Sequence, residues 1–182
     1  MQSGKIIKSF TAKDGHRVIL RTPRWDDLDD LLKLINSLVE ERADILRSEK
    51  ASREEEMEWL SRVLVRLEKD EVFYLAAEVE KNVVAVSEVS RRSGYESHVG
   101  AIGIAIKKGF RDLGIGTEMM KTLEERARET GLKVLTLSAF ANNKRAIHVY
   151  TKVGFVQTGC LPKRYFKEGK YVDEVIMVKL LE

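Results

Sequence analysis

Two stretches in the first half of the chain space their apolar residues as amphipathic helices do. The first follows Asp26 and Asp27, acidic residues that favour a helix N-terminus, and its apolar positions are Leu28, Leu31, Leu32, Ile35, Leu38 and Val39. The second is predicted to begin at Ser52, which forms a capping-box pattern with Glu55. Its apolar stripe contains Trp59, Leu60, Val63, Leu64 and Leu67.

Shorter apolar runs separated by turn residues predict strands. These runs cover residues 17–21, 72–79, 83–89, 99–106, 134–140, 155–158 and 171–180. Two further helices, residues 113–130 and 144–153, lie among the later strands, and each is followed by a glycine. The resulting order, βααβββαβαββ, has hairpins in its middle, which argue against an all-parallel sheet, and a late strand–helix alternation, which favours some parallel pairing. We therefore predict a mixed α/β (α+β) fold with one sheet and helices on both faces.

The composition fits one globular domain that spans residues 1–182. The chain has 182 residues, of which 43% are hydrophobic and 34% charged, so it carries enough apolar material for a core and too much for a disordered chain. The one cysteine, Cys160, excludes an internal disulfide and a cysteine-built zinc site. Three scattered histidines argue against a histidine-built metal site, so we expect no metal.

Charge and hydropathy indicate the cellular location and argue against binding to a membrane or a nucleic acid. The net charge is +3, and basic and acidic residues are interspersed, which is not the pattern of a nucleic-acid-binding surface. No apolar run is long enough to span a membrane, and residues 1–10 lack the apolar segment of a signal peptide. We therefore expect a cytoplasmic protein that binds neither a membrane nor a nucleic acid.

The segment from Ile104 to Thr117 carries the first chemical signal. A predicted strand ends there, a glycine-containing loop follows, and a long helix begins. Helix N-termini expose unpaired N–H groups, and glycines allow a ligand to approach the backbone closely, so this arrangement suits a phosphate or pyrophosphate group. The segment lacks the lysine of a Walker loop and the third glycine of a dinucleotide fingerprint. A tight turn with close helix–sheet packing is the alternative interpretation.

A second motif favours the ligand-binding interpretation. Arg111-Asp112-Leu113-Gly114-Ile115-Gly116 resembles the Arg/Gln-x-x-Gly-x-Gly acyl-CoA motif of the GNAT superfamily of N-acetyltransferases, and Asn143-x-x-Ala146-x-x-x-Tyr150-x-x-x-Gly154-Phe155 resembles its second signature. The resemblance covers residues 72–180 by element order and is sharpest over residues 104–155. Residues 161–180 are similar, more loosely, to members that acetylate amino-acid-like amines or ribosomal-protein N-termini.

The resemblance implies a mostly antiparallel sheet in which a central parallel pair, residues 99–106 and 134–140, splays apart at a β-bulge. Acetyl-CoA would be the cosubstrate, with its pantetheine arm in the V-shaped gap and its pyrophosphate on the loop amides. The implied cofactor-binding residues are Ile104, Ala105, Ile106, Arg111, Asp112, Leu113, Gly114, Ile115, Gly116, Thr117, Asn143, Tyr150 and Lys152. Asn143 is also suited to cap the following helix, and Lys152 is otherwise an ordinary exposed lysine.

The reaction implied is direct acyl transfer to a primary amine, which must lose a proton before it attacks. Tyr150 would protonate the leaving thiolate as general acid, and a core tyrosine with a locally satisfied hydroxyl is the alternative. A backbone N–H near Ile104 would stabilise the oxyanion. The predicted strand 99–106 has no carboxylate, in contrast to many members. We therefore take Glu88 as the candidate general base, because alternation puts it on the inward face with Val84 and Val86. A rim glutamate facing water is the alternative, and His98 is the second candidate base.

Other functions stay open from the sequence alone. A CoA-binding regulatory module without turnover is the main alternative, and a nucleic-acid or ribosome-associated protein, based on the basic cluster at residues 163–170, ranks last. The acceptor cannot be read from the sequence. Its pocket is expected to use the loops at residues 42–51, 91–97 and 163–170. Cys160 is interpreted as a small core residue, and a homodimer is one possible assembly.

Overall fold

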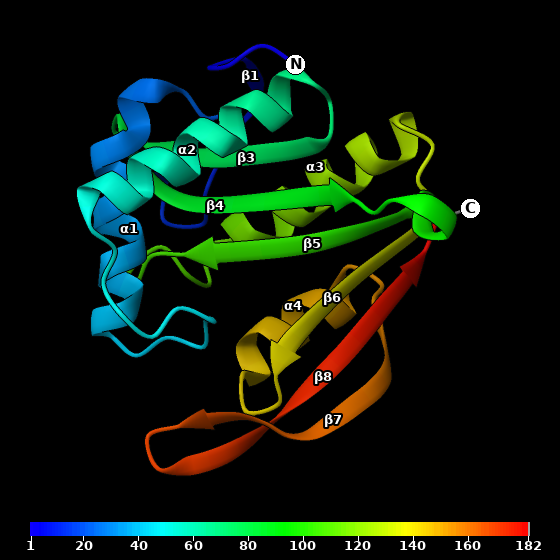
Figure 1. The fold of residues 1–182 in the computed structure, drawn as a ribbon. Helices are drawn as coiled ribbons and strands as arrows, with labels where there is room; N and C mark the ends of the chain where they lie inside the picture. The colour runs from blue at the N-terminus through cyan, green and yellow to red at the C-terminus, as the bar shows by residue number, and fades with distance from the viewer. Residues whose placement is uncertain (182) are drawn as a thin grey trace.

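The computed structural model describes residues 1–181 and contains one eight-stranded sheet with the strand order β1-β2-β3-β4-β5-β6-β8-β7 (Figure 1). The strands are β1 (Ile6–Thr11), β2 (Arg17–Arg21), β3 (Val72–Val79), β4 (Asn82–Arg91), β5 (Val99–Ile106), β6 (Val134–Phe140), β7 (Val156–Lys167) and β8 (Lys170–Leu180). Neighbouring strands are antiparallel except for the central pair β5 and β6. The predicted fold class is therefore confirmed.

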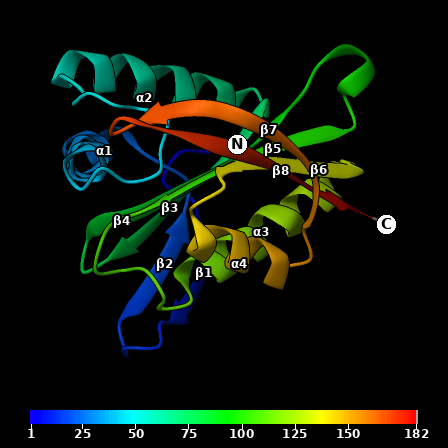
Figure 2. The same cartoon turned by 90° about the horizontal axis from the view of Figure 1, so that it is seen from below.

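The helices cover both faces of this sheet, as Figure 2 shows from below. α1 (Leu28–Glu40) and α2 (Arg53–Glu68) lie on one face, and α3 (Ile115–Glu129) and α4 (Lys144–Lys152) lie on the other. Two short 3-10 turns, η1 (Trp25–Asp27) and η2 (Gly94–Glu96), precede α1 and β5. The larger core packs α3 against the central strands, and a smaller core packs α1 and α2 against β3 and β4.

The helix starts follow the local sequence closely. The Ser52 hydroxyl accepts the Glu55 N–H at 3.2 Å and the Glu55 carboxylate accepts the Ser52 N–H at 3.0 Å, so the predicted capping box is present. α3 begins at Ile115 rather than at the predicted residue 113. The reason is backbone conformation: Asp112 and Gly114 have φ values of 66° and 90°, which no α-helix contains.

Two strands differ from the prediction. β1 was not predicted, because it is an edge strand in which Ile6 is exposed and the apolar pattern is weak. β7 runs to Lys167 instead of ending at residue 158. Most of its side chains are exposed on both faces, so no two-residue apolar period marks it in the sequence. Its long pairing with β8 comes from backbone hydrogen bonding instead.

The central parallel pair is joined at one end only. β5 and β6 pair at Val99–Val134, Gly100–Leu135 and Ala101–Thr136. Beyond these residues the two strands do not pair with each other. Figure 1 shows the two strands diverging from this joined end. The opening does not come from the implied bulge in β5, because the β4–β5 register runs without a shift from Ala85–Ile106 to Arg91–Gly100. β5 stays with β4 and β6 stays with β8, and this leaves a wedge between them.

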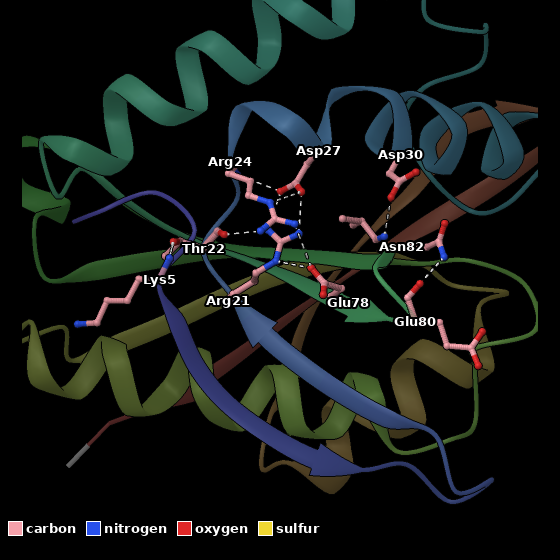
Figure 3. A network of polar contacts seen from close by, with 10 residues as sticks. Lys5, Arg21, Thr22, Arg24, Asp27, Asp30, Glu78, Glu80 and Asn82 are labelled. Carbon is pink, nitrogen blue, oxygen red and sulfur yellow. Dashed lines mark hydrogen bonds and ion pairs between the residues drawn. The ribbon is translucent and has the colours of Figure 1, made fainter.

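A buried ion-pair network fixes the start of α1 to the sheet (Figure 3). Arg21 on β2 is 2% exposed and donates to both oxygens of Asp27 at 2.7 Å, while its Nε donates to Glu78 on β3 at 2.7 Å. Asp30 of α1 accepts the backbone N–H of Val83 at 3.1 Å in the same region. Because charge is compensated on both sides of the guanidinium, the network tolerates its burial.

Within residues 1–181, no helix is both long enough and apolar enough to cross a membrane. The same residues contain no group of three or more histidine, cysteine, aspartate or glutamate side chains placed to hold a metal ion.

Candidate functional site

A single groove of about 1920 Å³ passes through the wedge between β5 and β6. On one face of the sheet it reaches the loop before α3 and the helix α4. On the other face it is lined by residues of α1, α2, the loop between them, β3, β4 and β7 and by Phe140 of β6, a part that we call the acceptor half. The groove therefore joins two differently lined spaces at the gap in the sheet.

The inner edge of β5 presents backbone groups that no strand pairs with, although the Ile106 carbonyl accepts the Arg111 Nε. The backbone N–H of Lys107 donates to the Val84 carbonyl, and that of Arg92 donates to the Val99 carbonyl. The backbone groups of the odd-numbered residues of β5 therefore face β4. The backbone groups of Ile102, Ile104 and Ile106 consequently face the wedge, because these groups alternate in direction along a strand. The three residues line the groove. An extended chain laid in the wedge would find there the hydrogen-bonding edge of a strand.

The loop between β5 and α3 provides a row of free N–H groups. The first backbone bond of α3 runs from Glu118 to Gly114, and no acceptor in the described part of the chain takes the N–H groups of residues 111–117. Gly114, at φ 90°, turns the chain so that these groups lie before and in the first turn of the helix. Successive free N–H groups next to the positive end of a helix form a typical anion-binding concavity.

Arg111 ties this loop to the other side of the groove. Its Nε donates to the Ile106 carbonyl at 2.9 Å, and its two Nη atoms bind the carboxylate of Glu41, the residue that follows α1. Arg111 and Glu41 are 24% and 16% exposed, so this ion pair is largely shielded from water. The loop and the end of α1 are thus held by one side chain.

The second predicted motif lies on α4, beside the loop. The side chain of Asn143 caps this helix by accepting the Ala146 N–H at 3.1 Å, as expected. Tyr150 is 8% exposed but still lines the groove, and its hydroxyl forms no hydrogen bond with any other part of residues 1–181. Burial raises the pKa of this hydroxyl to about 12. Tyr150 is therefore neutral near pH 7 and holds an unused O–H donor.

The remaining predicted cofactor-binding residues also lie around the loop and α4. All of them line the groove except Ile115, whose side chain is 1% exposed and packs in the core, so only its backbone belongs to the loop. Lys152 is exposed at the groove rim. Asp112 pairs with Arg145 at 3.4 Å, which joins the loop to α4.

Glu88 lies in the acceptor half, on β4 opposite Gly103 of β5. The Ser90 hydroxyl donates to one of its oxygens at 3.3 Å, and the other oxygen has no partner among the described residues. The predicted face is correct for Val86, but Val84 packs in the core on the other side of the sheet. A register shift in the β3–β4 pair next to Ala77 interrupts the alternation there.

Two other candidates lie outside the groove. His98, the second candidate base, is exposed just before the joined end of β5 and does not line the groove. Cys160, expected in the core, is exposed on β7, with its sulfur 4.0 Å from Asp173. Of the three predicted acceptor loops, residues 43–47 and Tyr165 line the groove, and no residue from 91 to 97 does.

Sequence reasoning missed the aromatic residues of the acceptor half. Trp59 and Tyr74 pack edge to face with ring centroids 5.4 Å apart, and Phe140 stacks on Tyr165 at 3.9 Å. All four line the groove. They come from α2, β3, β6 and β7, and in the sequence each resembles an ordinary core residue. Only the register of the sheet brings them together.

The end of the β7–β8 hairpin contacts the loop after α1. Lys167 binds Asp44 at 2.5 Å and the Ala43 carbonyl at 3.1 Å, and Arg42 pairs with Glu168 next to it. Figure 2 shows the hairpin reaching towards the side of the sheet that carries α1 and α2. These contacts bound the acceptor half.

Comparison with known proteins gives the class of this chain. The model of the Acetyltransferase (GNAT) family matches residues 32–155. YwnH of Bacillus subtilis (strain 168), provisionally named a phosphinothricin acetyltransferase, is 24% identical over 160 residues, which are 87% of this chain and 96% of YwnH. The L-amino acid N-acetyltransferase AaaT of Escherichia coli (strain K12) is 31% identical over 86 residues, 46% of this chain and 52% of AaaT.

A solved structure agrees with this result. The ribosomal-protein-alanine N-acetyltransferase of Brucella melitensis superposes with a TM-score of 0.79 and 27% identity, covering 89% of this chain and 99% of that one. The chain belongs to the GNAT acetyltransferase family. The predicted resemblance is confirmed: the protein is an acetyltransferase, and acetyl-CoA is its cosubstrate.

Proposed function

We propose that residues 1–182 act as one N-acetyltransferase domain that transfers the acetyl group directly from acetyl-CoA to a primary amine in a ternary complex. The observation that carries this proposal is the groove through the wedge. It joins a row of free loop amides on one face of the sheet to an acceptor half on the other. Both substrates can therefore reach the gap between β5 and β6 from opposite sides.

In this proposal the cosubstrate occupies the wedge and the loop. The pantetheine arm pairs with the inner edge of β5 at Ile104–Ile106, and the pyrophosphate binds the N–H groups of residues 111–117. Asn143 contacts the pantetheine while it caps α4, and Lys152 approaches a phosphate from the rim. The support is geometric: the residues border one groove, and the loop amides have no acceptor of their own.

The proposed chemistry depends on the protonation of the acceptor amine, of Glu88 and of Tyr150. A primary alkylammonium ion has a pKa of about 10, so near neutral pH the acceptor must lose a proton before its nitrogen attacks the thioester carbonyl. Glu88, with one oxygen free, is the proposed base. The N–H of Ile104 stabilises the oxyanion. Tyr150, neutral and unbonded, donates its proton towards the departing sulfur as the thioester C–S bond breaks.

The acceptor belongs to one of two classes, a small amine or amino acid, or a protein N-terminus. AaaT is named for L-amino acids, and the Brucella protein is named for a ribosomal-protein alanine. A homodimer is also part of this proposal. It is tested by light scattering on the purified protein, and a monomer at all concentrations would contradict it.

Release of free CoA thiol from acetyl-CoA in the presence of a panel of primary amines tests the activity. We expect amine-dependent release. Absence of release with every amine, together with tight acetyl-CoA binding in calorimetry, would instead favour a regulatory module that binds acyl-CoA without turnover.

The Tyr150→Phe variant tests the proposed proton donor. We expect kcat to fall about 100-fold, within the range of general acid catalysis, while the acetyl-CoA Kd stays close to the wild-type value, because the phenyl ring keeps the packing. Tyr95→Phe is the matched control, since Tyr95 is fully exposed and far from the groove. Equal kcat in Tyr150→Phe and wild type would remove Tyr150 from the mechanism.

A further inference from the structure

The acceptor half contains few charged groups. Among the described groove residues from α1, α2, their connecting loop, β3, β4, β6 and β7, only Asp44, Arg47 and Glu88 carry charge. The nature of the acceptor depends on which of these three are still available to bind it.

Two of the three are already paired. Asp44 binds the Lys167 ammonium at 2.5 Å. Arg47, the one cation of the acceptor half, binds the Glu55 carboxylate at 2.6 Å, and it also donates to the backbone carbonyls of Glu49 at 2.8 Å and Lys50 at 3.5 Å. Its Nε and Nη2 donors are thus directed at the protein. The one cation of the acceptor half therefore already has a carboxylate partner, although the Nη1 of Arg47 makes no hydrogen bond within residues 1–181.

Glu88 is the group that remains available. One of its oxygens accepts the Ser90 hydroxyl at 3.3 Å, and the other has no partner within residues 1–181. It is paired in register with Tyr74 on one side and Gly103 on the other. The free charge next to the wedge is therefore negative, which suits an ammonium ion and repels a carboxylate.

The rest of the acceptor half is aromatic and aliphatic. The Trp59–Tyr74 and Phe140–Tyr165 pairs come from different elements and line the same groove as Ile45 and Leu46 of the loop. The Tyr165 hydroxyl is taken by Glu174 at 2.6 Å. Such a lining stabilises an apolar or aromatic group by burial, and aromatic faces add attraction for a nearby ammonium.

We propose that the acceptor is a primary amine next to an apolar or aromatic group, with no carboxylate on the carbon that bears the amine. This rests on the proposed function. It selects amines such as an arylalkylamine or the N-terminus of a polypeptide, in which the neighbouring carbonyl is an amide. It excludes free α-amino acids, whose carboxylate would enter the acceptor half beside Glu88, where the one cation already has a carboxylate partner.

A series of acceptors that share one side chain tests this inference on the full chain. Phenylalanine, phenylalaninamide and phenethylamine carry the same benzyl group and differ at the carboxyl position. We expect the amide and phenethylamine to exceed phenylalanine in kcat/KM by about tenfold or more, because an unpaired buried charge is costly. A Phe-Gly-Gly amide peptide then separates the two sources: a higher kcat/KM for the peptide assigns a polypeptide N-terminus, and a higher value for phenethylamine assigns a small amine.

The Glu55→Gln variant tests the role of the Arg47 pairing. Glutamine keeps an oxygen that accepts the Ser52 N–H, so the capping box persists, but it removes the charge that holds Arg47. With Arg47 released, the preference for the amide over phenylalanine should narrow by up to about fivefold. The double variant Glu55→Gln/Arg47→Met should restore the wild-type preference, because it removes the released cation.

The outcomes separate this inference from the proposed function. Equal or faster acetylation of phenylalanine by the wild type overturns the inference and leaves the acetyltransferase activity intact. A preference that does not change in Glu55→Gln overturns the part assigned to Arg47. Absence of acetylation of all four compounds also overturns the inference, and the wider amine panel then decides separately on the proposed function.

Discussion

At the scale of single residues, the state of each proton donor depends on what surrounds it. Tyr150 and Tyr165 both line the groove, and the pKa of each is about 12. Burial is the cause for Tyr150, whereas for Tyr165 partial burial acts together with the hydrogen bond to Glu174. The Tyr150 hydroxyl is free to donate a hydrogen bond to a ligand, whereas the Tyr165 hydroxyl already donates to Glu174. From the sequence alone, both tyrosines could serve as proton donors. Their contacts in the structure decide which of them can.

The raised pKa of Tyr150 has a consequence for the pH dependence. A tyrosine with its ordinary pKa of 10 would lose its proton in the alkaline range, but a pKa of about 12 keeps Tyr150 protonated well above pH 10. We therefore expect the alkaline side of the kcat profile to show no loss attributable to Tyr150 up to pH 10. An apparent pKa near 10 that disappears in Tyr150→Phe would contradict this expectation.

At the scale of elements, the strand–loop–helix unit from β5 to α3 was predictable because its signal is local. Gly114 and Gly116, the preceding apolar strand and the following helix are all adjacent in the sequence. The unit's precise start was not predicted, because residues 113 and 114 have good helical neighbours but belong to the turn. The opening of the wedge was implied only by the resemblance, and its origin differs: β5 and β6 keep separate outer partners without a bulge in β5.

Gly114→Ala tests the turn that directs the loop amides. Gly114 has φ of 90°, which costs an L-residue about 1–2 kcal/mol, although no atom lies within 4 Å of an added Cβ. The loop should therefore change conformation while the core stays intact. We expect the acetyl-CoA Kd, measured by calorimetry, to rise about tenfold. Gly94→Ala, also in a positive-φ turn with open space around it, lies in the segment 91–97 that does not line the groove and should leave that Kd unchanged.

The buried ion-pair network makes a separate prediction about stability. Arg21→Met removes the buried cation that Asp27 and Glu78 share, and these carboxylates, which are 3% and 13% exposed, keep only the longer contacts to the half-exposed Arg24. We expect the free energy of unfolding in urea to fall by about 3–5 kcal/mol. Arg53→Met removes a cation from an exposed pair with Asp29 and should change it by less than about 1 kcal/mol. Similar losses in both variants would show that burial of the network does not matter.

At the scale of the whole molecule, the acceptor half is what the sequence could not provide. It is assembled from four strands, two helices and a loop that are separated by up to 130 residues, and its members carry no short-range motif. β7 illustrates the difficulty, because its exposed side chains give no strand pattern, yet it brings Tyr165 against Phe140. The residues proposed to bind acetyl-CoA, in contrast, could be named from the sequence, because they lie in contiguous motifs, and all of them except Ile115 line the groove.

The contact between the β7–β8 hairpin and the loop after α1 should govern acceptor binding. Lys167 joins the two through Asp44 and the Ala43 carbonyl and is 21% exposed. Lys167→Met removes this contact, and we expect the KM for the amine to rise severalfold while the acetyl-CoA Kd is unchanged. Lys170→Met, at an exposed position in the same hairpin, is the control. An unchanged KM in Lys167→Met would show that the loop holds its position without the hairpin.

The position of Arg111 has implications for how such a protein changes over evolutionary time. The same guanidinium that supports the Ile106 carbonyl is held by Glu41 at the end of the first helix. A lineage that alters this helix end to accept a new amine also disturbs the loop that we propose binds the acetyl donor. New specificity is therefore reached more easily through the aromatic lining or the hairpin, which can vary without touching that link.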